Sequence, residues 1–320
     1  PTGMANTPST LGVLVTEKTR AHGGILRNIK GERFMSKYSP VEMELAKRDE
    51  VSRSIYTEVA AGLGTKNGSV YLHVDHWTKE KILEIIPDVY EQYKNTGVDI
   101  SKEPMEIYPS MHHMMGGIKV DEWCRSSIPG LFAAGEVTRN VHGANRLGGN
   151  SIAEGQVFGR RSGISAAKFA KKVKNISLPK DQIEKEQTRI FSFINRKAGV
   201  TPHVVEDKLK QVMWDKVGIF RDEKRLLEAK KAIAKLKIEA KIMKTRTTLK
   251  ERNRDLQDCL EIENMLITAE SIVDAAILRK ESRGAHSRTD YPKTKKEWEK
   301  NISIKIVNEK LITEIVDVVR

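Results

Sequence analysis

The sequence predicts a multidomain chain that mixes the α+β and α/β classes, and three observations support this prediction. Short strand-like and helix-like patterns alternate over residues 1–174. Long polar helices with narrow apolar seams follow over residues 181–283. A segment with strand character ends the chain over residues 284–320. We therefore expect a mixed first part, a helical bundle domain and a small C-terminal α+β tail.

The first 110 residues are divided by glycine and proline into short elements. Alternating apolar residues indicate strands, and apolar residues spaced by three and four indicate helices. We predict a strand over 12–17, a hairpin over 23–35 with Lys30 and Gly31 at its turn, a helix over 41–64, a strand over 68–76 and a helix over 78–97 that Pro87 kinks or splits.

Residues 109–163 hold ten of the chain's 22 glycines. The sequence "GLFAAGE" at 130–136 predicts a short buried strand, and residues 151–172 predict a helix after a glycine loop. In this order, backbone N–H groups and a helix N-terminus can meet a polar ligand. We therefore expect a ligand pressed against this backbone.

The segment 175–181 is the clearest linker, and the helices that follow have bundle character. Apolar residues spaced by three and four form two seams, which predict bundle core rather than a binding groove. The seams are Leu226, Ala229, Ile233, Leu236, Ala240 and Met243, and then Ile262, Met265, Leu266, Ala269, Ile272, Val273, Ala276 and Ile277.

Composition excludes several classes of function. The chain has 320 residues, of which 39% are hydrophobic and 31% charged, as in soluble globular proteins. No apolar run is long enough for a transmembrane segment, and the first residues do not resemble a signal peptide. Cys124 and Cys259 have no metal-ligand spacing, so we expect no metal site and a reducing compartment.

The net charge of +13 would suit a polyanion such as nucleic acid or an anionic membrane surface. Most of the excess lies in predicted exposed helix faces at 168–174 and 224–250, without the interleaved aromatic residues of a single-strand groove. We interpret it as a solvated surface and expect no nucleic-acid partner.

Several charged residues fall where the patterns predict the protein interior. Glu17 and Arg20 follow the first strand, Arg48 precedes a helical turn, and His112 and Arg146 flank glycines. A buried arginine is costly unless it meets an anion, and guanidinium binds carboxylate with two hydrogen bonds. This residue set therefore suits a small dicarboxylate.

At these residues the chain resembles the succinate dehydrogenase/fumarate reductase flavoprotein subunit family. Four ordered blocks carry the resemblance, at residues 1–35, 44–54, 109–160 and 263–292. It implies a capping (substrate) domain over 1–110 and the carboxy-terminal part of an FAD-binding domain over 111–174. The implied roles are Arg48 as proton donor, with Glu17 and Arg20 relaying protons to it; Thr16, His112 and Arg146 as substrate ligands; and Glu136, Asn150, Ser151 and Ile152 as contacts to FAD.

The resemblance implies a reaction in which fumarate and succinate interconvert by hydride transfer with FAD and proton transfer from Arg48. It also implies a partner, an iron–sulfur electron-transfer subunit, and a cytoplasmic place, peripheral on the membrane through partner subunits. The family's glycine-rich dinucleotide fingerprint and the histidine that precedes its "PTG" are not in these residues. We therefore expect the amino-terminal FAD-binding half to be missing from this chain.

Two alternatives remain open from the sequence. An L-aspartate oxidase-like flavoenzyme shares the "RD" and "HGANR" elements, although "HHMMGGI" and "NRLGGNS" favour the fumarate branch. The chain could also be a non-catalytic fragment that lacks the FAD-binding half.

Overall fold

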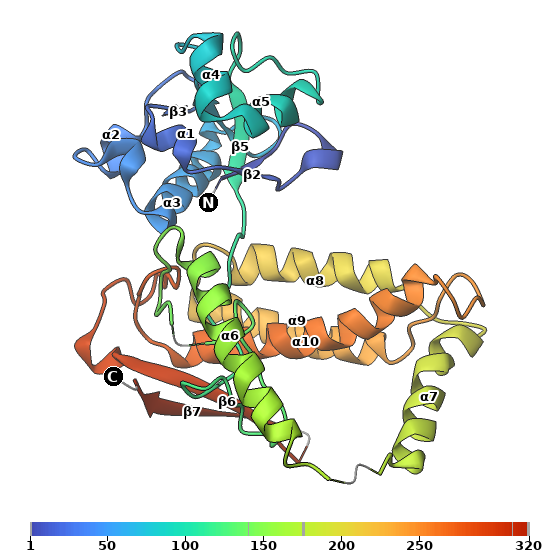
Figure 1. Cartoon of the computed structure of the whole chain (residues 1–320). Helices are drawn as coiled ribbons and strands as arrows, with labels where there is room; N and C mark the ends of the chain where they lie inside the picture. Colours follow the sequence, from blue (N-terminus) through green and yellow to red (C-terminus); the bar gives the residue numbers. More distant parts are fainter. Residues whose placement is uncertain (1, 140, 175–176, 309, 319–320) are drawn as a thin grey trace. The chain divides into compact units, whose positions relative to one another are not determined.

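The computed structural model describes residues 2–139, 141–174, 177–308 and 310–318, and the chain divides into two compact units (Figure 1). Unit 1 comprises residues 1–117 together with 145–147. Unit 2 comprises residues 118–144 and 148–320. The short segment 145–147 therefore belongs to unit 1, although the residues on either side of it belong to unit 2.

Unit 1 is built on an antiparallel sheet with the strand order β2-β1-β5-β4-β3. Its inward side chains alternate along the strands, so that Val70 and Leu72 of β4 and Met105 and Ile107 of β5 are buried. The strands are β1 (Thr2–Met4), β2 (Leu14–Val15), β3 (Ile25–Arg27), β4 (Val70–His73) and β5 (Met105–Pro109).

Short helices cover this sheet and complete its apolar core, which includes Ile55, Ile82 and Tyr93. Pro87 divides the predicted helix at 78–97 into two, because proline cannot donate the internal hydrogen bond. The helices are η1 (Pro8–Thr10), α1 (Lys18–Ala21), α2 (Met35–Tyr38), η2 (Met43–Leu45), α3 (Arg48–Glu58), the π-turn η3 (Val59–Leu63), α4 (Lys79–Ile85) and α5 (Pro87–Lys94).

Two predictions for unit 1 were wrong in part. The predicted hairpin at 23–35 does not form: β3 pairs with β4, and residues 35–38 are helical. A turn does occur there, with Gly31 at φ +79°, but it leads out of the strand rather than back along it. The predicted helix at 41–64 is interrupted at Ala46, and α3 begins only at Arg48.

Unit 2 begins with irregular chain. The predicted buried strand at 130–136 was wrong, since only an isolated bridge between Arg125 and Phe132 occurs and Leu131 is exposed. Positive φ angles at Gly130 and Gly135 interrupt the extended backbone. The predicted helix that follows is confirmed as α6 (Asn150–Ala170).

The helical bundle of unit 2 consists of α7 (Lys180–Asn195), α8 (Pro202–Val217), α9 (Glu223–Ala240) and α10 (Arg254–Leu278). Both predicted seams are confirmed as bundle core, with Leu226, Ala229 and Ile233 fully buried and Met265, Ile272 and Ile277 partly buried. The predicted linker at 175–181 lies partly outside the described residues; its described part leads into α7.

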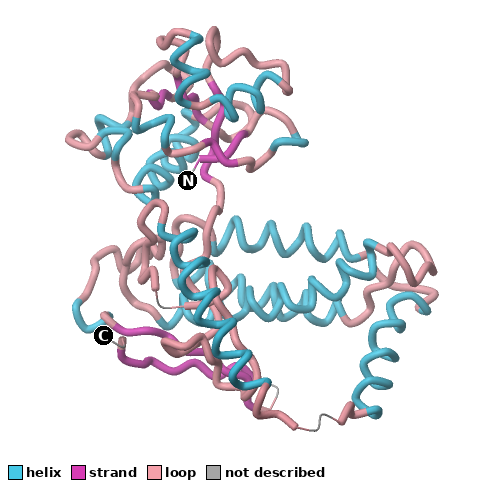
Figure 2. Tube along the Cα trace, in the orientation of Figure 1, coloured by secondary structure: helices cyan, strands magenta, loops and turns pink. Residues whose placement is uncertain are grey.

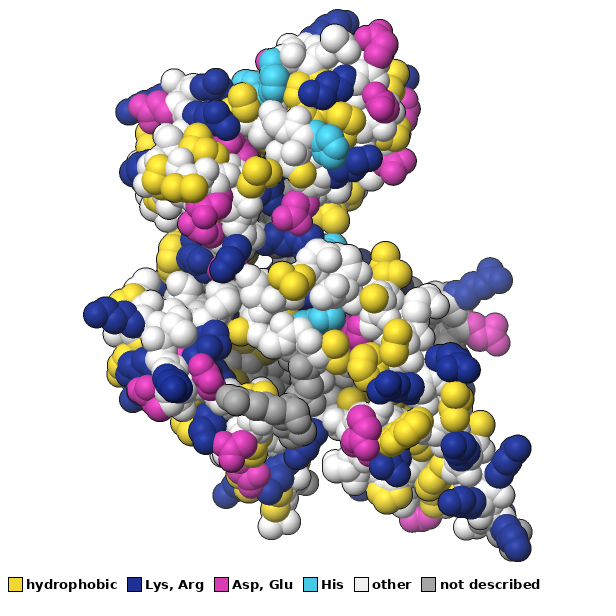
Figure 3. All heavy atoms as spheres, turned by 60° about the vertical axis from the view of Figure 1, so that its left-hand side comes forward, with side chains coloured by type: hydrophobic (Ala, Val, Ile, Leu, Met, Phe, Trp, Pro, Cys, Tyr) yellow, Lys and Arg dark blue, Asp and Glu magenta, His cyan; other side chains and the backbone are white. Residues whose placement is uncertain are grey.

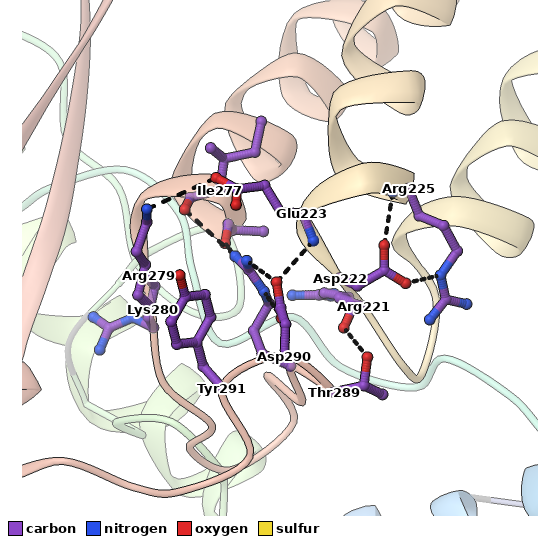
Figure 4. Close-up of polar contacts among 12 residues, drawn as sticks. Arg221, Asp222, Glu223, Arg225, Ile277, Arg279, Lys280, Thr289, Asp290 and Tyr291 are labelled. Carbon is purple, nitrogen blue, oxygen red and sulfur yellow. Dashed lines mark hydrogen bonds and ion pairs between the residues drawn. The ribbon is translucent and has the colours of Figure 1, made fainter.

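The carboxy-terminal tail is fastened to the bundle by an ion pair between the buried Arg288 and the more exposed Asp290. Arg288, fully buried, donates to the Ala276 carbonyl at the end of α10 (2.7 Å) and binds Asp290 through two nitrogens. Asp290 in turn accepts from the backbone N–H of Glu223 at the start of α9 (3.0 Å; Figure 4). This brace (Arg288 and Asp290) satisfies groups at the ends of two helices.

After the brace, η4 (Lys296–Trp298) leads into an antiparallel hairpin of β6 (Lys300–Val307) and β7 (Lys310–Asp317), drawn in magenta in Figure 2. The strands predicted in the tail are thereby confirmed.

Candidate active site

Three charged residues of unit 1 form a polar network around one carboxylate. Glu17, which occupies the N-cap position of α1 two residues after β2, accepts from Nε of Arg48 (2.5 Å) and also binds its Nη2. The other carboxylate oxygen of Glu17 lies 3.6 Å from Nη2 of Arg20. Glu17 therefore links two guanidinium groups. Glu17 immediately precedes α1 and Arg48 is the first residue of α3, so the starts of these two helices position the pair.

Arg20 is the buried member of this network. Its residue is 4% exposed, its Nη1 donates to the Glu44 carbonyl, and its Nε has no hydrogen-bond partner among the described residues. Burial lowers the pKa of Arg20, and nearby Arg48 lowers it further, whereas Glu17 and Glu44 raise it. The guanidinium is thus less strongly basic than usual.

Arg146 and His112 lie in the same neighbourhood as Arg48. Partial desolvation lowers the pKa of His112, and the positive charges of Arg146 and then Arg48 lower it further. Arg146 is 8% exposed, yet its Nε has no hydrogen-bond partner among the described residues, and Nη1 makes only a 3.3 Å contact to the Leu147 carbonyl. Unsatisfied donors at a cationic site are suited to an anion.

Thr16 stands beside this group at the end of β2. Its hydroxyl oxygen accepts from the backbone N–H of Lys18 (3.3 Å), which leaves the hydroxyl proton available for donation. All six residues predicted for substrate binding and proton transfer belong to unit 1: Thr16, Glu17, Arg20, Arg48, His112 and Arg146. Direct contacts join Arg48, Glu17 and Arg20, and the charges of Arg146 and Arg48 act on His112.

The four residues predicted to contact FAD lie in unit 2. Glu136 is exposed, and Asn150, Ser151 and Ile152 form the first turn of α6, where no side chain caps the helix. Ile152 is 74% exposed. Gly149, at φ +80°, has open space where a Cβ would stand, so a flat ring can approach this backbone. A helix start without a side-chain cap, an exposed apolar side chain and open backbone at Gly149 together fit a flavin.

A further cation in unit 2 was missed by sequence reasoning. Nε and Nη1 of Arg139 are buried and have no hydrogen-bond partner among the described residues, and burial lowers its pKa. Such a group fits the anionic character of FAD. No pattern of spacing pointed to it, because a single arginine in a loop is usually a surface residue.

Sequence reasoning also missed a buried polar cluster that fastens α6. Glu154, 4% exposed, accepts from the Thr138 hydroxyl (3.2 Å) and lies 3.0 Å from Nε2 of His142. The only available signal was an acidic residue within an otherwise apolar and small-residue helix face. The cluster connects Thr138 and His142 to the first turns of α6.

The lysine-rich faces of the bundle form ion pairs between helices. Lys230 and Lys237 of α9 bind Asp274 and Glu270 of α10, respectively. On the face drawn in Figure 3, basic side chains are interspersed with acidic and hydrophobic ones. No described helix is long and apolar enough to cross a membrane.

Comparison with known proteins identifies the family. Residues 1–152 match the model described as "FAD binding domain", and residues 206–316 match "Fumarate reductase flavoprotein C-term". The chain belongs to the succinate dehydrogenase/fumarate reductase flavoprotein family, and the family supports FAD as cofactor. The FAD-binding match begins at residue 1, so the predicted absence of an amino-terminal FAD-binding half stays a prediction.

Relatives agree with this assignment. The chain is 47% identical to a fumarate reductase (CoM/CoB) polypeptide of Methanothermobacter marburgensis, over 94% of this chain and 54% of the relative. It is 38% identical to the "8-methylmenaquinol:fumarate reductase flavoprotein subunit" of Wolinella succinogenes, over 92% of this chain and 49% of the relative. The chain therefore spans about half the length of these relatives.

A solved structure described as "Quinol-Fumarate Reductase with Menaquinol Molecules" matches with a TM-score of 0.91 and 32% identity, over 100% of this chain and 59% of that chain. This match confirms the predicted mixed α/β fold.

Proposed function

We propose that this chain is the part of an FAD-dependent oxidoreductase that binds fumarate or succinate and moves the proton when the two interconvert. The observation that carries the proposal is the group formed by Arg48, Arg146 and His112 in unit 1, in which Arg146 keeps an unsatisfied buried Nε. Three cationic or polar donors in one place match the two carboxylates of a four-carbon diacid.

The residues of the chain have separate tasks in this reaction. Arg146, His112 and Thr16 bind the carboxylates and orient the carbon–carbon double bond. FAD, when bound, supplies or accepts the hydride. Arg48 gives its proton to the neighbouring carbon during reduction and takes one back during oxidation.

After Arg48 has given up its proton, its reprotonation requires a carboxylate in contact with it and a further proton donor in contact with that carboxylate. Glu17 is hydrogen-bonded to Arg48, and Arg20, whose pKa burial lowers, lies on the other side of Glu17. A proton can thus pass from Arg20 through Glu17 to Arg48. Two guanidiniums sharing one carboxylate supply the crowded cationic environment in which an arginine can act as an acid.

FAD would be held in unit 2 by the first turn of α6, by Glu136 and by Arg139. The family's dinucleotide fingerprint is not in these residues, so we propose that polypeptide outside them completes the cofactor site. The exposed face of α6 supports this, since Ile152 and Val157 are 74% and 50% exposed and Gly155 and Gly159 have open space around them. An electron partner of the iron–sulfur type and a cytoplasmic place stay predictions from the family.

The decisive experiment is Arg48→Lys in the complete protein. We expect fumarate reduction and succinate oxidation to fall by about 10³-fold, because lysine cannot donate in the same geometry, while FAD content stays unchanged. Arg27→Lys is the matched control, since Arg27 lies on β3 of the same unit and its side chain hydrogen-bonds to the Gly31 carbonyl (2.6 Å), not to the site residues.

Activity of Arg48→Lys within tenfold of the wild type would show that Arg48 is not the proton donor. Turnover of L-aspartate, with none of fumarate or succinate, would favour the L-aspartate oxidase alternative.

A further inference from the structure

A hydrogen bond in unit 1 joins two residues that stand next to the proposed substrate arginines. Nδ2 of Asn145 donates to Oδ1 of Asp49 (2.7 Å), across 96 residues of sequence. Asn145 directly precedes Arg146, and Asp49 directly follows Arg48. The Asp49 side chain is 12% exposed, so the bond is largely shielded from water.

We propose that Asn145 and Asp49 form a clamp that sets the spacing between the guanidinium groups of Arg48 and Arg146. The clamp rests on the proposed function, and it assigns to two residues outside the substrate-binding set the task of positioning those that hold the diacid. Neither residue contacts the substrate in this proposal; both are positioning residues.

Electrostatics explains why the site requires such a clamp. The positive charges of Arg146 and Arg48 both act on His112 and lower its pKa, so the two guanidinium groups lie in one neighbourhood. Like charges placed near each other repel. Glu17 offsets part of the charge of Arg48, but Arg146 has no carboxylate partner among the described residues, so the substrate's carboxylates relieve the remaining repulsion only while the substrate is bound. A bond between an amide and a carboxylate does not depend on substrate, so it holds the two arginines at working distance in the free enzyme.

The other partner of Asp49, Arg53, cannot set the spacing between Arg48 and Arg146. Nη2 of Arg53 lies 2.8 Å from Oδ2 of Asp49, but Arg53 is four residues away on the same helix, α3. That ion pair joins two residues of α3 and stabilises its first turns. Only Asn145 connects α3 to the segment 145–147, which carries Arg146, among the hydrogen bonds of Asp49 in the described part of the chain.

The test reverses the polarity of the clamp in the complete flavoprotein. Asn145→Asp places two carboxylates against each other, and we expect kcat/KM for fumarate to fall by about 10 to 100-fold, since misplacement by about 1 Å costs up to that much. Adding Asp49→Asn restores one donor and one acceptor, and activity should return to within about threefold of wild type. FAD content reports folding of every variant.

Two further variants separate positioning from general structural damage. Asn145→Ala removes the donor without adding charge, and it should change the ratio of the inhibition constants of malonate and glutarate, because a looser spacing alters selectivity for diacid length. Arg53→Gln is the matched control: it removes the other partner of Asp49, and both the ratio and kcat/KM should stay within about threefold of wild type.

The clamp is wrong if Asn145→Asp keeps wild-type activity, or if Asp49→Asn fails to rescue it in a protein with full FAD content. The clamp is also wrong if Asn145→Ala leaves the inhibitor ratio unchanged. In each of these cases the wild-type protein still turns over fumarate, so the proposed function stands. A wild-type protein that binds FAD but acts on neither fumarate nor succinate overturns the proposed function and the clamp together.

Discussion

Replacing His286 should make the protein more resistant to mild acid. Nδ1 of His286 accepts from Nη1 of Arg221 (2.9 Å), and its Nε2–H donates to the Arg279 carbonyl (3.2 Å). Burial, and then the charges of Arg221, Arg279 and Arg288, lower the pKa of His286 from 6.5 to about 4. The ring is therefore held in its neutral form.

The size of the effect follows from this pKa. Between about pH 6.5 and pH 4 the unfolded chain binds a proton at His286 and the folded chain does not, so stability falls as the pH falls through that window. At pH 4.5 the loss amounts to about 2.5 kcal/mol, at about 1.4 kcal/mol per unit of pKa shift. Above pH 6.5 the loss is absent.

The assay compares wild type with His286→Asn, which does not titrate and keeps an oxygen acceptor near the position of Nδ1. Urea unfolding, followed by tryptophan fluorescence, for which Trp123, Trp214 and Trp298 of unit 2 supply three of the four tryptophans, gives the free energy of unfolding at pH 7 and pH 4.5. Wild type should lose about 2.5 kcal/mol more than the variant over this range. His203→Asn, at an exposed position of α8, controls for loss of a histidine as such. Equal losses in wild type and His286→Asn would refute the reasoning.

The remaining predictions concern a glycine and an arginine of unit 2. Gly284→Ala should lower the free energy of unfolding by roughly 3 kcal/mol, because Gly284 has φ +55° and an added Cβ would collide with the Ala144 carbonyl. Gly143→Ala, at a similar φ of +58° but in open space, should cost only about 1 kcal/mol, and equal costs would contradict the collision argument. Arg139→Met should stabilise the 320-residue chain by about 1 kcal/mol, since it removes two buried nitrogens without hydrogen-bond partners among the described residues, and should weaken FAD binding by the complete protein about tenfold. Arg125→Met, at an exposed ion pair with Asp121, is the control in both measurements; unchanged FAD affinity in Arg139→Met would exclude an FAD role for Arg139.

Periodic patterns predicted those parts of the fold that depend on local sequence. The seams of α9 and α10 and the helix α6 were predicted because a helical face repeats every three or four residues. The hairpin at 23–35 failed because a turn at Gly31 does not determine which strand β3 pairs with, and its partner, β4, lies far along the chain. The strand at 130–136 failed because an apolar run between two glycines is typical of a strand only where the glycine backbone stays extended.

The site was predicted in its residue types but not in its connections. Family resemblance named Arg48, Glu17 and Arg20, and the structure places them in contact through Glu17. No spacing could have paired Asn145 with Asp49, since the bond joins segments that only folding brings together. The unsatisfied donors of Arg139 were equally invisible in sequence, because burial of a loop residue depends on its surroundings.

We expect the brace of Arg288 and Asp290 to make the tail and the bundle open and unfold together. If the segment around Arg288 detached, the last carbonyls of α10 would lose a donor and the first amide of α9 would lose an acceptor. Amide protons at these two helix ends should therefore exchange with solvent only through the same opening event, and their protection factors should be equal. A protease that cuts between Leu278 and Arg288 should unfold the bundle rather than only remove the tail.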